Sequence, residues 1–129
     1  MIASLLYSSS ASPSVDSGDV FSIIEISARN NPRRDVTGFL IYDGREFLQY
    51  VEGPQDALDT LLETLGRDTR HHSVRILHRA QSDKRLFPKW AMRRAGEGAE
   101  NELATIRRTD LPSEMRVEID RFGAQRKAA

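Results

Sequence analysis

The sequence has 129 residues, the length of one domain with a single hydrophobic core. Nineteen basic residues balance nineteen acidic ones, so the chain lacks the excess positive charge that binders of nucleic acids and anionic membranes commonly use. It contains no cysteine, which excludes disulfides, zinc–thiolate sites and thiol catalysis. Because no apolar run approaches the ~20 residues of a membrane span and no signal peptide is recognisable, we expect a cytoplasmic protein.

The chain is expected to begin with a strand and a helix. Residues 2–8 form a short apolar run before the turn-rich sequence SSSASPS, which predicts a buried strand. Apolar residues then recur at helical spacing, and Pro32 ends this pattern, which predicts a helix over residues 20–31. Asn31 would lie at the end of the inner face of this helix.

A hairpin and a second helix follow. Asp43-Gly44 is a strong hairpin signal and predicts strands over residues 37–42 and 46–51. Gly53-Pro54 opens a helix that ends near Gly66. One face of this helix carries four leucines with the spacing of a buried stripe: Leu58, Leu61, Leu62 and Leu65.

Two further strands, over residues 74–77 and 90–92, complete the order βαββαββ. This order predicts a ferredoxin-like α+β sandwich, with a five-stranded mixed sheet and two helices on one face. The other face would be left apolar, because Leu48 and Tyr50 point toward it. Something must cover that face.

The last part of the chain, residues 96–129, predicts two short amphipathic helices separated by Pro112. Their apolar residues recur at roughly helical spacing: Leu103, Ile106, Leu111, Met115, Ile119 and Phe122. These helices could fold back over the bare sheet face or join a neighbouring subunit. We therefore divide the chain into a domain of residues 1–95 and a helical extension of residues 96–129.

The strand sequence FLQYVEG places a polar residue among apolar ones. Strand side chains alternate between faces, so Gln49 points the same way as Phe47 and Val51, toward the helices. A buried amide left without hydrogen-bond partners costs about 1–3 kcal/mol for each unmet group. On the predicted fold Tyr7 and Asn31 converge on the same space, so three polar side chains meet there.

These three side chains are suited to binding rather than to acid–base catalysis. A phenol and two amides are poor proton donors or acceptors near neutral pH, but they form good hydrogen bonds. They would hold the edge of a planar heterocycle, and Tyr7 could also deliver an electron and a proton. Aliphatic side chains would cover the faces of such a ring: Ile23, Ile24 and Leu65.

Each residue also has an ordinary structural explanation. Gln49 alone is more often a core amide bonded to backbone, Tyr7 a core tyrosine with a wet hydroxyl, and Asn31 a helix-ending residue. A metal site is not expected at His71-His72, since adjacent histidines point apart and no third ligand stands at a suitable spacing. No single residue therefore indicates a functional site; the indication comes from the combination of Tyr7, Asn31 and Gln49 in one place.

Trp90 and Met92, two residues apart, are expected on one face of the last strand and are core residues by default.

Over about residues 1–95 the sequence closely resembles the BLUF family, the domains that sense blue light using FAD. Four segments carry the resemblance by their order and spacing: LLYSSSA, ARNNPRRDVTGFLIYDGREFLQYVEGP, RDTRHHSVRIL and RLFPKWAM. The pattern T-G-x-L-x-Y, a glycine hairpin and then F-x-Q-x-x-E-G-P is specific when it is combined with the upstream tyrosine, Asn-Asn and the late F-P-x-W-x-M.

The resemblance implies FAD bound without a covalent link between the two helices, with FMN or riboflavin as the other candidates. Tyr7 would be the photochemical electron and proton donor, Gln49 the hydrogen-bond relay to the flavin, and Asn31 the amide that fixes the ring. Trp90 and Met92 would relay the signal. The full set of expected cofactor-binding residues is Tyr7, Ile23, Ile24, Ser27, Asn31, Phe47, Gln49, Leu65, Asp68, Arg70 and His71.

Two positions depart from the family pattern. Several relatives carry an arginine where this sequence has Ser8, and Pro32 directly follows the key asparagine. The first bears on the loop near the flavin, the second on how tightly Asn31 is held. Neither position is one of the photochemical residues.

The resemblance implies a photosensor without catalytic turnover. Residues 96–129 leave room only for two helices, so we expect signalling through a homo-oligomer or a downstream protein partner. One alternative is a flavin-free interaction module with the same fold. Another is a small acylphosphatase-like hydrolase, although the serine-rich loop after Tyr7 has no arginine or glycine to cradle a phosphate.

Overall fold

The structure, a computed structural model, describes residues 2–11, 35–42, 46–67, 71–95 and 100–128. Its elements are β1 (Ile2–Ala11), β2 (Thr37–Tyr42), β3 (Glu46–Gly53), α2 (Gln55–Arg67), β4 (His71–Ser82), β5 (Ala91–Ala95), α3 (Glu100–Arg108) and α4 (Ser113–Ala128). The helix predicted over residues 20–31 lies outside the described residues.

The five strands form one mixed sheet with the order β4-β1-β3-β2-β5. β1 lies between β3 and β4 and pairs antiparallel with both, and β2 also pairs antiparallel with β3. β5 joins the edge of the sheet by pairing parallel with β2. This arrangement confirms the predicted ferredoxin-like α+β fold class.

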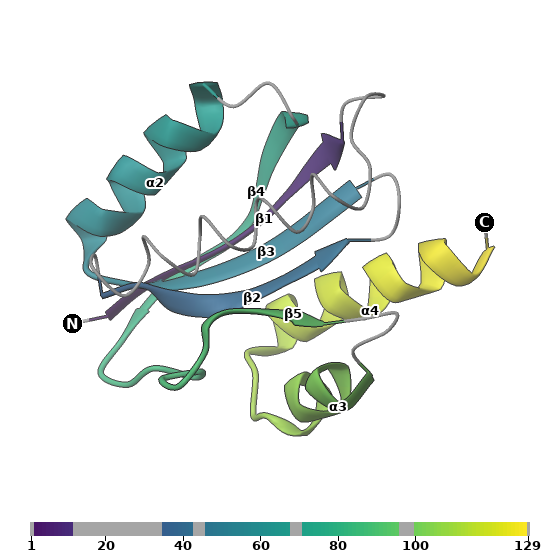
Figure 1. The fold of residues 1–129 in the computed structure, drawn as a ribbon. Helices are drawn as coiled ribbons and strands as arrows, with labels where there is room; N and C mark the ends of the chain where they lie inside the picture. The colour runs from purple at the N-terminus through teal and green to yellow at the C-terminus, as the bar shows by residue number, and fades with distance from the viewer. Residues whose placement is uncertain (1, 12–34, 43–45, 68–70, 96–99, 129) are drawn as a thin grey trace.

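The sheet has helices on both sides, as Figure 1 shows, with α2 over one face and α3 and α4 over the other. We call the face toward α2 the inner face and the face toward α3 and α4 the outer face. Leu58 and Leu61 of α2 pack on the inner face, as the leucine stripe predicts. Leu48 and Tyr50 lie on the outer face, as the strand alternation predicts.

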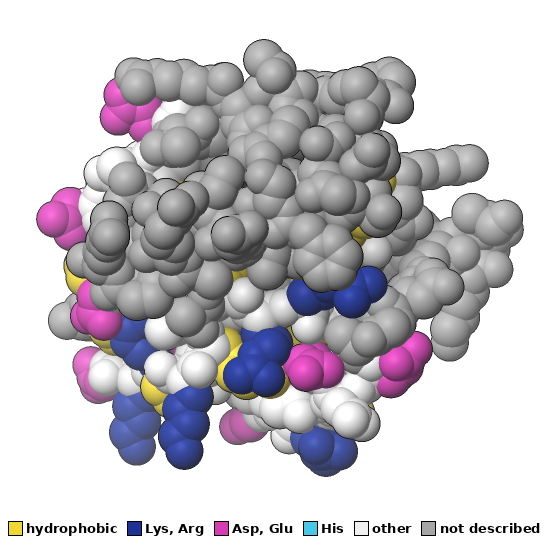
Figure 2. All heavy atoms as spheres, in the orientation of Figure 1, with side chains coloured by type: hydrophobic (Ala, Val, Ile, Leu, Met, Phe, Trp, Pro, Cys, Tyr) yellow, Lys and Arg dark blue, Asp and Glu magenta, His cyan; other side chains and the backbone are white. Residues whose placement is uncertain are grey.

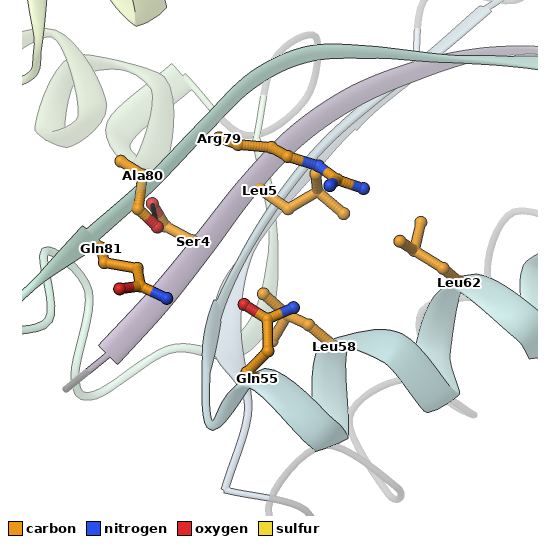
Figure 3. Close-up of a pocket in the computed structure, with 8 residues that line it drawn as sticks. All are labelled: Ser4, Leu5, Gln55, Leu58, Leu62, Arg79, Ala80 and Gln81. Carbon is orange, nitrogen blue, oxygen red and sulfur yellow. Dashed lines mark hydrogen bonds between the residues drawn. The ribbon is translucent and has the colours of Figure 1, made fainter.

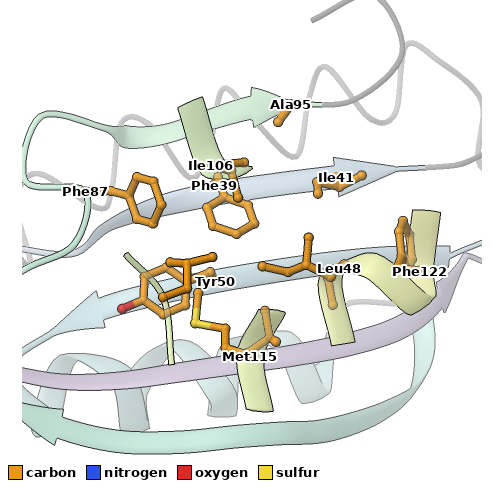
Figure 4. Close-up of a cluster of buried hydrophobic side chains, with 12 residues drawn as sticks. Phe39, Ile41, Leu48, Tyr50, Phe87, Ala95, Ile106, Met115 and Phe122 are labelled. Atoms are coloured by element: carbon orange, nitrogen blue, oxygen red, sulfur yellow. The ribbon is translucent and has the colours of Figure 1, made fainter. Parts of the chain in front are cut away.

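The two C-terminal helices cover the outer face of their own chain. Ile106 of α3 and Met115 and Phe122 of α4 join the cluster formed by Leu48 and Tyr50, and all five are buried (Figure 4). Aromatic rings extend this cluster, with Phe39 stacked on Tyr50 at 5.6 Å and Phe87 edge-on to both. The predicted cover of the bare sheet face is therefore confirmed within one chain.

Two strands are longer than the sequence suggested. β1 continues to Ala11 and β4 extends over residues 71–82, where only residues 74–77 were predicted. β4 is mostly exposed and polar, so its sequence carries no hydrophobic alternation at its ends. Backbone pairing with β1 over almost its whole length makes it a strand in spite of that composition.

The expectation that Trp90 and Met92 share one strand face is wrong. β5 begins at Ala91, and its pairing moves from Gly38↔Ala91 to Phe39↔Arg93, which leaves Met92 as an extra bulged residue. Met92 lies in the inner-face cluster, whereas Trp90 packs against the outer-face cluster. The bulge breaks the two-residue period on which the expectation rested.

Gly38 makes this junction possible. Its φ is 153°, and a Cβ at this position would overlap the carbonyl group of Tyr50 in the neighbouring strand. Its amide donates a hydrogen bond of 2.8 Å to the carbonyl oxygen of Trp90. A glycine therefore fixes the point at which the chain enters β5.

Met115 should contribute strongly to stability. Its side chain is 1% exposed in the outer-face cluster, so Met115→Ala should lower the free energy of unfolding by about 2–5 kcal/mol through lost packing and a residual cavity. Val117→Ala on the same helix is the matched control, because Val117 is 52% exposed and its change should stay within about 0.5 kcal/mol. Urea unfolding followed by circular dichroism measures both; equal losses would contradict the described packing of α4.

Candidate functional site

Three long side chains from three strands meet on the inner face. Tyr7 comes from β1, Gln49 from β3 and Met92 from the β5 bulge, and they are 1%, 4% and 3% exposed. Tyr7 and Gln49 are direct cross-strand partners in the β1–β3 register, which brings their side chains side by side. The strand alternation in the sequence predicts this convergence of Tyr7 and Gln49.

A chain of hydrogen bonds joins the three side chains. The Tyr7 hydroxyl donates to Oε1 of Gln49, and Nε2 of Gln49 donates to Sδ of Met92 at 3.1 Å. The amide thus has a partner at each end, and both partners are side chains rather than backbone. The sequence did not predict the Gln49–Met92 contact, because a regular strand would have placed Met92 beside Trp90.

The surroundings of this chain are apolar. The inner-face cluster holds buried side chains from β1, β2, β3 and α2 and from the residue just before β2: Ala3, Leu5, Val36, Leu40, Phe47, Val51, Leu58 and Leu61. Burial raises the pKa of the Tyr7 hydroxyl far above its ordinary value, since a phenolate would lose its hydration there. Tyr7 is therefore a neutral hydrogen-bond donor.

The remaining candidate residues fall into two groups. Phe47 is buried on the inner face and its ring stacks on Tyr42 at 4.7 Å. The other candidates lie outside the described residues or, for Leu65 and His71, are described in their backbone alone: Ile23, Ile24, Ser27, Asn31, Leu65, Asp68, Arg70 and His71.

A separate cavity of about 250 Å³ lies on the same side of the sheet. It opens between α2 and the strands β1 and β4, and Figure 3 shows Gln55 and Leu58 of α2 on the same side as Leu5, Arg79 and Gln81. None of the three side chains of the hydrogen-bonded chain lines it. The cavity is therefore distinct from the place where Tyr7, Gln49 and Met92 meet.

The described surface carries charged side chains of both signs. Lysine and arginine side chains lie among aspartate and glutamate side chains on the face in Figure 2, as the balanced composition suggests. Within the described ranges, no group of three histidine, aspartate or glutamate residues is placed to hold a metal ion. No described helix is long and apolar enough to cross a bilayer.

A sequence model of the family described as sensors of blue-light using FAD matches residues 2–93. The chain belongs to the BLUF family. BLUF domains are photosensors that bind a flavin. The family match therefore identifies this chain as a blue-light sensor domain.

Curated relatives carry this domain within longer proteins. The chain is 31% identical over 97 residues to photoactivated adenylate cyclase subunit beta of Euglena gracilis, covering 74% of this chain and 11% of that protein. It is 28% identical over 92 residues to the blue light- and temperature-regulated antirepressor of Escherichia coli K12, covering 71% of this chain and 23% of the relative. The chain thus spans about a tenth to a quarter of these relatives.

Solved structures share the fold. The dark-state structure of the BLUF protein BlrB has a TM-score of 0.73 and 32% identity, with 80% of this chain and 78% of BlrB covered. BlrP1 of Klebsiella pneumoniae with FMN and cyclic diGMP has a TM-score of 0.76 and 26% identity, with 91% of this chain and 33% of BlrP1 covered.

Because of Tyr7, the free energy of unfolding should fall as the pH becomes alkaline. Its folded-state pKa lies above the ordinary value near 10, so ionisation favours the unfolded chain and stability is lost as the pH rises above about 10. Between about pH 9 and pH 11 the free energy of unfolding should fall more steeply for the wild type than for Tyr7→Phe. Urea titrations at each pH measure this difference; equal slopes would contradict the buried, neutral phenol.

Proposed function

We propose that this chain senses blue light through Tyr7 and Gln49, which act on a flavin bound at the inner face. The observation that carries the proposal is the buried hydrogen-bonded chain from Tyr7 through Gln49 to Met92. An amide with a donor on one side and an acceptor on the other can exchange its two ends, so Gln49 can store two arrangements.

The residues present fit a flavin. A phenol and an amide, surrounded by apolar side chains, offer the hydrogen bonds and the dry walls that an aromatic ring with polar edges needs. A bound flavin supplies the absorption of blue light and accepts an electron. We propose FAD as the cofactor, and FMN in the structure of BlrP1 is the alternative that this relative supports.

Tyr7 would be the donor in the light reaction. Its phenol would supply an electron and a proton, and Oε1 of Gln49, which accepts the Tyr7 hydroxyl, would take up that proton. Tyr7 would recover both once the amide has changed its hydrogen bonds. The cycle would leave no net oxidation, and only the arrangement of Gln49 would differ.

The remaining candidates would hold the cofactor. Asn31 would bond to the polar edge of the ring, and the aliphatic residues would cover its faces. Polar residues after α2 would approach the side chain of the flavin. These assignments rest on the family resemblance: Ile23, Ile24, Ser27, Asn31, Leu65, Asp68, Arg70 and His71.

The signal would leave through β5. Met92 contacts Gln49, and the next residue, Arg93, lies over the Trp90 ring at 5.5 Å and pairs with Glu102 of α3 at 3.7 Å. A change at Gln49 that moves Met92 therefore reaches α3 within two contacts. We propose that residues 96–129 pass this change to a second copy of the chain or to a downstream partner. The cytoplasmic location of the protein stays a prediction from the sequence.

Blue light should cause a small reversible red shift of the flavin absorption band, because rearranged Gln49 gives the ring an additional hydrogen bond. Tyr7→Phe should keep the flavin bound and abolish the shift, since the ring of residue 7 remains but the donor is gone. Tyr42→Phe is the matched control and should keep the shift. Dark-minus-light absorption spectra measure all three; a normal shift in Tyr7→Phe, or a colourless purified wild type, would contradict the proposal.

Gln49 and Asn31 should fail in different ways. Gln49→Leu should bind flavin but show no light-induced shift, because a leucine cannot exchange hydrogen bonds. Asn31→Ala should instead weaken flavin binding by about 1–3 kcal/mol, the cost of a buried polar atom left unmet. Flavin occupancy after dialysis and the light response together separate the two roles. A Gln49→Leu variant that still photocycles would rule out the amide as the relay.

A further inference from the structure

Glu52 is a buried carboxylate that the light reaction described above does not use. It lies on β3 with 1% of its surface exposed, on the outer face. Oε1 accepts hydrogen bonds from the Tyr50 hydroxyl at 2.8 Å and from the Leu86 amide at 2.8 Å. Oε2 accepts from the Phe87 amide at 2.7 Å and from the Thr37 hydroxyl at 3.1 Å. Four hydrogen-bond donors therefore stabilise the buried Glu52 carboxylate, which water does not reach.

Two of these donors belong to the chain segment between β4 and β5. This β4–β5 connection comprises residues 83–90, and the amides of Leu86 and Phe87 both point at the Glu52 carboxylate. Charge-assisted bonds of this kind are shorter and stronger than bonds between neutral groups. The connection is thereby fixed to β3, three residues from Gln49.

Arg85 holds the same connection on its other side. Its guanidinium donates to the Asp35 carbonyl oxygen at 2.6 Å, to the Glu52 carbonyl oxygen at 3.1 Å and to the Thr37 hydroxyl at 3.0 Å. It also pairs with the Asp35 carboxylate at 3.0 Å. The Thr37 hydroxyl thus accepts from Arg85 and donates to Glu52, which joins the two anchors into one network.

The connection leads directly to Met92. The Phe87 carbonyl accepts from the Trp90 amide at 3.2 Å, and the two rings stack at 5.0 Å. Trp90 is held in turn by Gly38, and two residues later Met92 has a φ of 86°. A methionine keeps this left-handed conformation only where its surroundings impose it. The position of the Met92 sulfur beside Gln49 therefore depends on how the preceding segment is held.

We propose that Glu52 is a positioning residue for the Gln49 relay. Its carboxylate fixes the β4–β5 connection, and through that connection it keeps Met92 Sδ within hydrogen-bond distance of the Gln49 amide. This inference rests on the proposed function, because it assigns Glu52 an influence on the arrangement of Gln49. With the sulfur held in place, the Gln49 amide must break its hydrogen bond to Met92 Sδ before it can rearrange in the dark, and a loosened sulfur lowers that barrier.

Glu52→Gln tests this role in the full-length protein with its flavin bound. The amide nitrogen replaces one carboxylate oxygen and cannot accept a backbone N–H, so the anchor of Leu86 or Phe87 is lost. We expect the red shift to remain and its thermal recovery to become about fivefold faster, the factor that corresponds to one hydrogen bond of typical strength. Tyr50→Phe is the matched control: it removes one donor to the same carboxylate, leaves both backbone anchors, and should change the recovery rate less than about twofold.

A double-mutant cycle separates positioning from general loosening. In a Met92→Leu background, which keeps the bulk of the side chain but removes the sulfur acceptor, Glu52→Gln should no longer change the recovery rate. The same factor in both backgrounds would overturn the proposal, as would equal effects of Tyr50→Phe and Glu52→Gln. If Glu52→Gln does not fold, Arg85→Lys loosens the same connection while it leaves the carboxylate in place, and it should speed recovery in the Met92 background alone.

A second readout does not need the light reaction. Trp90 is the sole tryptophan of the sequence, so its fluorescence reports on the connection at one position. In the dark, acrylamide should quench Trp90 about twofold more strongly in Glu52→Gln than in Tyr50→Phe, as expected when one hydrogen bond that restrains the segment is lost. Quenching of Trp90 in Glu52→Gln that equals the wild-type value would contradict the claim that Glu52 fixes the β4–β5 connection. A wild type without a red shift, but with the expected quenching, would instead contradict the proposed function.

Discussion

The buried amide of Gln49 is the group on which the arrangement of this protein depends. Its side chain lies on an apolar sheet face, where each unmet polar atom would cost about 1–3 kcal/mol. Tyr7 and Met92 meet these needs from β1 and β5, and the two strands lie on either side of β3 in the sheet order. The parallel addition of β5 beside β2 is therefore part of the site, because it brings the methionine across the sheet to the amide.

The two faces of the sheet carry different kinds of side chain. The inner face carries the polar chain of Tyr7, Gln49 and Met92, whereas the outer face carries a cluster of aromatic rings and of apolar side chains from α3 and α4, with the Glu52 network beside it. Buried apolar side chains on both faces contribute to stability.

The sequence predicts much of this site, and the limits of the prediction have physical causes. Alternation along FLQYVEG places Gln49 inward, and the pairing of its strand with β1 brings it to Tyr7. The contact between Gln49 and Met92 was not predictable, because it depends on a β-bulge that turns the Met92 side chain to the inner face of the sheet. Periodicity also gives no sign of the bulge, because left-handed backbone at a methionine has no sequence signal.

Glu52 shows a second limit. It lies at the end of a strand, and a glutamate in such a position is usually exposed to solvent. Its burial arises because the β4–β5 connection, more than thirty residues later in the chain, turns two backbone amides toward it. Only the tertiary structure brings these groups together. Of the four donors to this carboxylate, only the Tyr50 hydroxyl comes from a neighbour in sequence, so the burial of Glu52 depends mainly on tertiary contacts.

The size of the energies bears on which part of the molecule can carry a signal. One rearranged hydrogen bond is worth on the order of 1 kcal/mol, whereas a shift of a two-state element from 1:99 to 99:1 needs about 5.5 kcal/mol. Light should therefore change the populations of two states that are already close in energy. The Arg93–Glu102 pair, which is partly exposed and spans β5 and α3, has a strength of at most about 1 kcal/mol and lies within this range. The contacts of Met115 and Phe122 are far stronger in sum, so the junction of β5 with α3 is a more suitable place for the change than the packing of α4 on the sheet.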